Sequence, residues 1–123
     1  MAATEKSNKH LQDFKEEFGK VLDPVAYLNK TYPELCTTFL QMHEQTLSDG
    51  VLSRKLKLLI HSAITAAQHD TEATSMHILG AIRAGASENE IRETAFAIIP
   101  VAGMPAFAIF LNAWDKVISS QNS

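Results

Sequence analysis

Apolar residues recur at spacings of three and four near the start of the chain, which is the pattern of one helix face. The residues on this stripe are Leu11, Phe14, Phe18 and Val21. Asp23-Pro24 interrupts the pattern, and a short turn is expected from there through Leu28. The chain therefore begins with an amphipathic helix that is followed by a break.

A second helix is predicted from Pro33 to about Leu47, because proline is tolerated in the first turn of a helix. Its inward face is expected to carry Leu35, Phe39 and Met42. The turn residues Ser48-Asp49-Gly50 end it. Beyond that turn the helical pattern resumes.

Two further helices follow in the middle of the chain. Ser53 can cap a helix from about Arg54 to Gln68. The apolar face expected on that helix carries Leu56, Leu59, Ile60 and Ala63. Another helix is predicted from about Asp70 to Ala84, and Gly85 closes it at a position that favours a left-handed residue.

Ser87 and Glu90 have the S-x-x-E spacing of a capping box, which predicts a helix start. This helix carries Ile91, Ala95 and Ile98 on its apolar face. Gly103-Met104-Pro105 starts a last helix that ends near Val117, before a frayed Ser-Ser-Gln-Asn-Ser tail. With about six helices and no clean strand alternation, the chain is predicted to be an all-α bundle with one domain over residues 1–123.

The stretch from Ala95 to Leu111 has 17 residues and no charge, which is the lower limit for a membrane span. Pro100, Gly103 and Pro105 interrupt it. Such breaks would free backbone groups that lipid cannot satisfy. We therefore expect two buried helices joined at a Gly-Pro corner, and no membrane partner.

Composition narrows the class of protein only slightly. The 123 residues include 46% hydrophobic residues and 11 basic against 14 acidic ones, a net charge of -3. A basic patch, as expected of a nucleic-acid-binding protein, is missing from this sequence. The N-terminus lacks the apolar stretch of a secretory signal, and Cys36 is the only cysteine. These features favour a cytoplasmic location without disulfides.

Four short motifs lie in order between Leu52 and about Trp114. They are Leu52-Ser53-Arg54-Lys55 before an apolar helix, His77 eight residues before Gly85, the turn Gly85-Ala86-Ser87-Glu88-Asn89-Glu90-Ile91, and the corner Gly103-Met104-Pro105-Ala106. Their order and spacing resemble the carboxymuconolactone decarboxylase and alkylhydroperoxidase D superfamily. The resemblance implies an alkylhydroperoxidase D-like helical fold. It also implies a homo-oligomer, a trimer or hexamer, whose interface we expect on the last two helices.

The peroxidase branch of this superfamily carries a Cys-x-x-Cys pair ahead of the histidine. The corresponding positions, in two possible spacings, are Asp70 and Ala73 or Thr71 and Thr74. The glutamate of that branch falls on Leu58. Because disulfide-based peroxide reduction needs a thiolate and a resolving thiol, we expect no thiol peroxidase activity. Cys36 is interpreted as a buried structural thiol.

The decarboxylase branch also lacks the cysteine pair and keeps a glutamate five residues before the histidine, here Glu72. This resemblance implies lyase-type acid/base chemistry on a small organic acid or lactone, with His77 as general acid or base. Five residues turn a helix by about 140°, so Glu72 and His77 do not share a face. His61 lies three residues after Leu58 and could approach the place of the missing glutamate. The predicted catalytic residues are therefore His77, Glu72 and His61.

Three further residues are candidates for substrate binding. They are Asp70, Thr74 and His69. Asp70 lies two turns before His77 on nearly the same face, and Thr74 could hydrogen-bond the ring of His77. Asp70 has the alternative role of a helix N-cap, and His77 or His61 could be structural histidines. His10 and His43 are expected to face solvent.

These histidines and carboxylates lack the H-x-x-x-H or E-x-x-H spacing of a metal site. We therefore expect no metal and no cofactor. The alternative to an enzyme is a non-catalytic oligomeric binding or scaffold protein that retains the fold, since Leu58 and Ala73 are chemically inert at motif positions.

Overall fold

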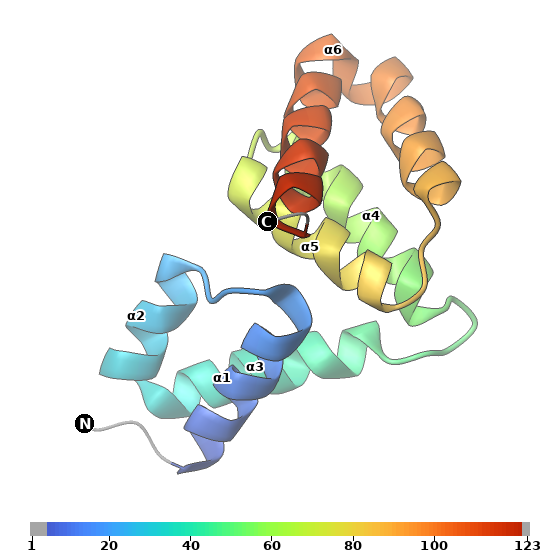
Figure 1. Cartoon of the computed structure of the whole chain (residues 1–123). Helices are drawn as coiled ribbons and strands as arrows, with labels where there is room; N and C mark the ends of the chain where they lie inside the picture. The colour runs from blue at the N-terminus through green and yellow to red at the C-terminus, as the bar shows by residue number, and fades with distance from the viewer. Residues whose placement is uncertain (1–4, 122–123) are drawn as a thin grey trace. The chain divides into compact units, whose positions relative to one another are not determined.

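The computed structural model describes residues 5–121, and their side chains from residue 8 onward (Figure 1). The helices are α1 (Glu5–Phe18), α2 (Asp23–Thr31), α3 (Pro33–Leu47), α4 (Arg54–Ala67), α5 (Thr71–Arg83) and α6 (Glu88–Gln121). This range contains helices and no strand, which confirms the all-α prediction. Residues 1–4, where no secretory signal was expected, and residues 122–123 of the expected frayed tail lie outside the described range.

The helices form two compact units, residues 1–48 and residues 49–123. In the first unit, α1 and α2 each pack against α3. In the second unit, α4, α5 and α6 pack against one another. The assignment of one domain to the whole chain stays a prediction.

In the first unit, the segment expected to be a break and a turn is the helix α2. Pro24 occupies the first turn of this helix, where its missing N–H removes no intrahelical hydrogen bond. Val25 is the buried residue of α2. The prediction was wrong because Asp23-Pro24 starts a helix here instead of only ending one.

The core of the first unit includes Phe14 and Phe18 on α1, as predicted. On α3 the inward face was predicted wrongly. Leu35 and Met42 are each 51% exposed. The buried face carries Pro33, Cys36, Leu40 and Leu47. This face is rotated by about one residue, or about 100°, from the expected one because α3 must contact both α1 and α2.

Two side chains of α3 that carry chemistry are packed within the first unit. Cys36 has no exposed surface, and its Sγ lies 3.8 Å from the Val25 carbonyl oxygen, to which it donates. His43 is half-buried against aromatic rings, with centroid distances of 5.3 Å to Phe14 and 5.5 Å to Phe18. The expectation that His43 faces solvent was therefore wrong.

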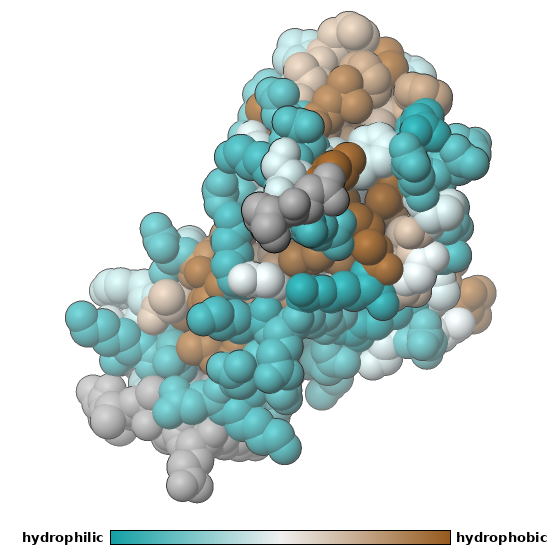
Figure 2. Space-filling view, viewed as in Figure 1, coloured by the Kyte–Doolittle hydropathy of each residue, from teal (hydrophilic) through white to brown (hydrophobic). Residues whose placement is uncertain are grey.

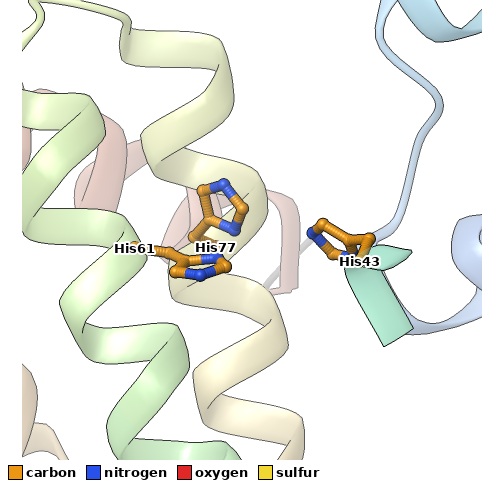
Figure 3. Close-up of side chains that lie close together, drawn as sticks. All are labelled: His43, His61 and His77. Carbon is orange, nitrogen blue, oxygen red and sulfur yellow. The ribbon is translucent and has the colours of Figure 1, made fainter. Parts of the chain in front are cut away.

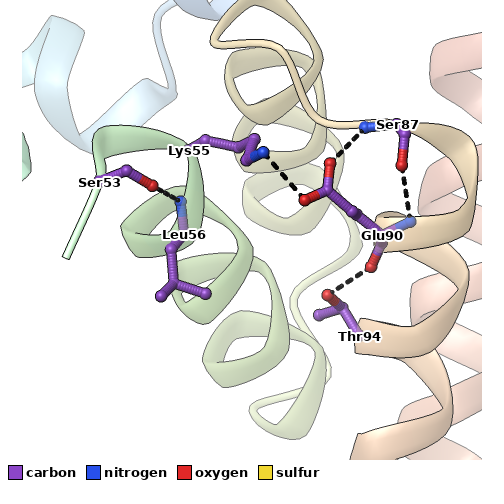
Figure 4. Close-up of polar contacts among 6 residues, drawn as sticks. All are labelled: Ser53, Lys55, Leu56, Ser87, Glu90 and Thr94. Carbon is purple, nitrogen blue, oxygen red and sulfur yellow. Dashed lines mark hydrogen bonds and ion pairs between the residues drawn. The ribbon is translucent and has the colours of Figure 1, made fainter.

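The second unit begins with the predicted N-cap of α4, where the Ser53 hydroxyl accepts from the Leu56 amide at 3.1 Å (Figure 4). The capping box of α6 is also present. Ser87 Oγ accepts from the Glu90 amide at 3.0 Å, and Glu90 Oε1 accepts from the Ser87 amide at 2.9 Å. Two of the recognised motifs therefore begin helices.

Glu90 also joins two helices, because its Oε2 lies 2.9 Å from Lys55 Nζ at the start of α4 (Figure 4). The hydrogen bond from the Ser87 amide, followed by that from Lys55, lowers the pKa of the Glu90 carboxyl. The lysine of the basic lead-in and the glutamate of the turn thus form one structural contact between α4 and α6.

The α6 helix turns back on itself at Gly103, where φ is 85° and ψ is 175° (Figure 1). Its two halves face each other, and the Arg92 guanidinium lies 5.7 Å from the centre of the Trp114 ring. The predicted corner is therefore confirmed. The last half continues to Gln121, beyond the expected end near Val117.

The two halves of α6 are less buried than expected. Phe96, Val101 and Met104 are 51%, 91% and 61% exposed. By length and composition α6 could cross a membrane, and only 22% of its most apolar 18-residue stretch is buried. Figure 2 shows apolar surface at the top of the view, over the turn of α6. The prediction of two buried helices was wrong in this respect.

The buried face of α4 also differs from the expected one. It carries Leu58, Leu59, Ser62 and Ala66. Of the four residues expected inside, Leu56 and Ile60 are 41% and 39% exposed. Part of the apolar stripe seen in the sequence therefore lies on the outer side of the helix, and the buried face is shifted toward Leu58, Ser62 and Ala66.

Candidate functional site

Hydroxyl side chains lie at the contact between α4 and α5, which we call the polar seam. Thr65 and Thr74 meet there, and Ser62 lies on the buried face of α4. The Thr65 and Thr74 hydroxyls lie 2.9 Å apart across the two helices. Thr74 also donates to the Asp70 carbonyl at 2.7 Å, and Ser62 donates to the Leu59 carbonyl at 2.6 Å. These bonds satisfy groups that would be costly to bury alone.

Two histidines meet at this seam, one from each helix. The ring centroids of His61 on α4 and His77 on α5 are 5.0 Å apart, and the rings meet edge to face at 85° (Figure 3). His77 is buried, with 7% of its surface exposed, and His61 is half-buried. We call His61 and His77 the histidine pair.

Burial favours the neutral form of the His61 ring. Removal of the ring from water lowers the pKa of His61 below its ordinary value. A neutral imidazole has one nitrogen that donates and one that accepts a hydrogen bond. Two imidazolium rings at this separation would repel each other. The environment of the pair therefore disfavours two positive charges on it.

Glu72 lies in the first turn of α5 and points to a different neighbour. Its Oε1 is 3.3 Å from Lys116 Nζ on α6, and both side chains are more than half exposed. A carboxylate is favourable near the N-terminus of a helix, which gives Glu72 a structural role as well. Its predicted catalytic role stays a prediction.

The three predicted substrate-binding residues lie around the start of α5. Asp70 is the N-cap, and its carboxylate accepts from the Ala73 amide at 3.0 Å. The Thr74 hydroxyl bonds within the polar seam as described. His69 is exposed and has a positive φ of 58° in the link between α4 and α5. The structure thus brings His61 to His77 and gives Asp70 and Thr74 local structural bonds.

Sequence analysis did not select Ser62 and Thr65 as parts of the seam. The signal was available, because Thr65 lies four residues after His61 and residues at this spacing share a helix face. The apolar stripe on the opposite side of α4 outweighed it. The seam was missed because buried faces are usually the more apolar ones.

Comparison with known proteins agrees with this fold. A crystal structure from Burkholderia xenovorans LB400, of a candidate carboxymuconolactone decarboxylase, superimposes with a TM-score of 0.75 and 22% identity. The match covers 96% of this chain and 97% of that one. No curated protein matches this chain. The profile of the carboxymuconolactone decarboxylase family matches residues 33–116, so it extends ahead of the motif at Leu52 to include α3. The chain therefore belongs to the carboxymuconolactone decarboxylase family.

Proposed function

We propose that the protein is a lyase-type acid/base enzyme for a small organic acid or lactone, with His77 as the central residue. The observation that supports this most is the contact between His61 and His77, since it places two proton-carrying rings together at a helix contact. The family name points to a lactone acid as the class of substrate. The activity requires no thiol.

The proposed reaction follows from what a histidine pair can do. Cleavage of the bond between the carboxylate carbon and its neighbour releases carbon dioxide and leaves the electron pair on the neighbouring carbon. A protonated imidazole of the pair then donates its proton to that carbon and becomes neutral. Water returns a proton to the ring. His77 acts as the donor, and the His61 ring, whose pKa burial lowers, packs edge to face against it.

The test is a decarboxylation assay with γ-carboxymuconolactone, in which released carbon dioxide is measured. General acid catalysis contributes about 10²–10⁴-fold, so His77→Ala should lose at least about a hundredfold in rate. His10→Gln on α1 is the matched control, and it should keep the rate of the parent protein. Equal rates in His77→Ala and the parent would refute the proposal.

A non-catalytic binding or scaffold protein is the second candidate, and the burial of His77 favours it. With 7% exposure, His77 offers a ligand little surface. A structural histidine at this position would affect stability, whereas a site residue would affect ligand turnover. If His77→Ala melts many degrees lower and binding of the lactone acid is unchanged, the scaffold function is preferred.

Thiol chemistry is not part of the proposal. Cys36 is fully buried, and its Sγ donates to the Val25 carbonyl oxygen, which suits a structural thiol in a reducing compartment such as the cytoplasm. We expect no turnover of hydroperoxide with a thiol-recycling system. Turnover that disappears in Cys36→Ser would contradict this expectation.

A further inference from the structure

The histidine pair brings two ring nitrogens together across α4 and α5. One nitrogen of His61 and one of His77 lie within 4.8 Å of each other. The rings meet edge to face, with their centroids 5.0 Å apart (Figure 3). The two histidines are 16 residues apart in the sequence and belong to different helices, so no short spacing motif marks them. For this reason the sequence predicted no metal here.

The separation of the two nitrogens is close to the one that a shared metal ion requires. Imidazole nitrogens bind zinc at about 2.0–2.1 Å, so two of them on one tetrahedral ion lie about 3.3 Å apart. The torsion that orients a histidine ring on its Cβ has broad minima. Rotation of the rings can therefore close the remaining distance while both helices stay in place.

The helices that carry the pair are joined one helical turn away from it. Thr65 follows His61 by four residues and Thr74 precedes His77 by three, and residues at these spacings are neighbours on a helix face. The hydroxyls of Thr65 and Thr74 lie 2.9 Å apart across the two helices. The chain thus positions two ligands before any metal binds, which lowers the ordering cost of binding.

The chemistry of the two nitrogens selects the class of ion. Imidazole suits zinc, copper and nickel, whereas magnesium and calcium prefer oxygen ligands. A histidine must be neutral to bind a metal, and removal from water favours the neutral form of His61 by lowering its pKa. The carboxylate of Asp70 caps α5, and that of Glu72 faces α6. The pair therefore offers nitrogen ligands to an ion that prefers them.

We propose that His61 and His77 together bind one divalent transition-metal ion of the zinc class, with the other coordination positions open to water or a ligand. Structural zinc sites use four protein ligands and catalytic sites use three. A site with two histidine ligands should therefore bind zinc reversibly and release it to a chelator.

This site does not depend on the proposed decarboxylation, because metal binding requires only the ring nitrogens. The two uses exclude each other, since a nitrogen that binds zinc cannot carry the proton that His77 donates in the proposed reaction. The zinc-bound protein should therefore lack its general acid. Zinc binding by a protein that releases no carbon dioxide would support this site and refute only the proposed reaction.

The test is calorimetric titration of the full chain with zinc chloride near neutral pH, after treatment with EDTA. The parent protein should bind one zinc ion per chain. His61→Gln removes the imidazole and should weaken zinc binding at least tenfold, because loss of a residue that only orients a metal ligand already costs about 10–100-fold. His69→Gln is the matched control, since His69 is exposed in the link between α4 and α5, and it should bind zinc as the parent does.

A second measurement covers the buried ligand, because His77 is 7% exposed and His77→Gln can lower stability by itself. A metal that binds only the folded state raises the melting temperature. Zinc should therefore raise the melting temperatures of the parent and of His69→Gln, but not those of His61→Gln and His77→Gln. A parent protein that binds no zinc would overturn the proposal. Equal zinc affinity in the parent and His61→Gln would also overturn it, as would loss of binding in His69→Gln.

Discussion

The two sides of α4 differ in what they carry: the buried side mixes apolar and hydroxyl side chains, whereas the other side is apolar and partly exposed. The side that packs on α5 carries Ser62, Thr65 and His61, and its hydroxyls bond inside the polar seam. The other side carries Ile60 and Ile64, which are 39% and 51% exposed. The buried side holds Leu58 and Leu59 together with the hydroxyls, and the other side leaves Ile60 and Ile64 partly exposed. One helix therefore combines a mixed, buried contact with an exposed apolar stripe.

The largest expected effect comes from residues on these two sides of α4. Leu58→Ala removes a side chain with no exposed surface, and such a change costs about 2–5 kcal/mol of unfolding free energy. Ile64→Ala changes an exposed residue, which usually costs about 0.5 kcal/mol or less. Urea denaturation of the two single variants should show this difference. A loss in Ile64→Ala as large as that in Leu58→Ala would mean that the Ile64 side chain is buried in the protein in solution.

A smaller effect is expected within the polar seam. Thr74→Val removes the hydroxyl that bonds to Thr65 and to the Asp70 carbonyl, and one hydrogen bond contributes about 1 kcal/mol net. Because the two hydroxyls share a bond, the double variant Thr65→Val with Thr74→Val should cost less than the sum of the single variants. Strict additivity in denaturation experiments would show that this bond does not contribute to stability.

Mild acid should lower the stability of the folded protein through the protonation of His61. The pKa of His61 is lowered in the folded state from 6.5, so the unfolded chain binds a proton first as the pH falls. Stability should decrease from about pH 6.5 down to the folded pKa and then level off. Denaturation midpoints between pH 7.5 and pH 5 should show this decrease in the parent protein. His61→Gln should flatten it, and an equal decrease in that variant would assign the effect to another group.

The smallest effect is expected at Glu90. Its folded pKa lies below 4.5, so its contribution to stability is present above that value and is lost as the pH falls through the folded pKa. The ion pair with Lys55 is solvent-accessible and contributes little at neutral pH. Glu90→Gln should therefore melt close to the parent at pH 7. A thermal scan showing a loss as large as that of Leu58→Ala would contradict this assignment.

The sequence predicted the capped helix starts correctly, but it missed the start of α2 and predicted helix faces poorly. Ser53, Ser87 and Glu90 signal their helices through local hydrogen bonds, and local bonds can be recognised from spacing alone. The buried faces of α3 and α4 depend on which neighbours pack there, and that information is not local. On α4 the more apolar stripe was assigned to the interior, although part of it lies outside.

Only part of the candidate site was predicted, because its side-chain packing also depends on neighbouring helices. The approach of His61 to His77 was expected from the family resemblance, and the structure places the two rings together. Glu72 follows the helix geometry, since its position five residues before His77 turns it toward Lys116. The seam formed by Ser62 and Thr65 was missed because a hydroxyl can bond to its own helix and be buried without an apolar signal.

The corner at Gly103 also limits how far each half of α6 could reach across an apolar layer. The uncharged residues on each side of it, 94–102 and 104–114, form helical runs of nine and eleven residues, or about 14 and 17 Å at 1.5 Å per residue. A hydrocarbon core is about 30 Å thick. A side chain at residue 103 is strained because φ is 85° there. Gly103 therefore divides the most apolar segment into two helical runs, each shorter than the thickness of a hydrocarbon core.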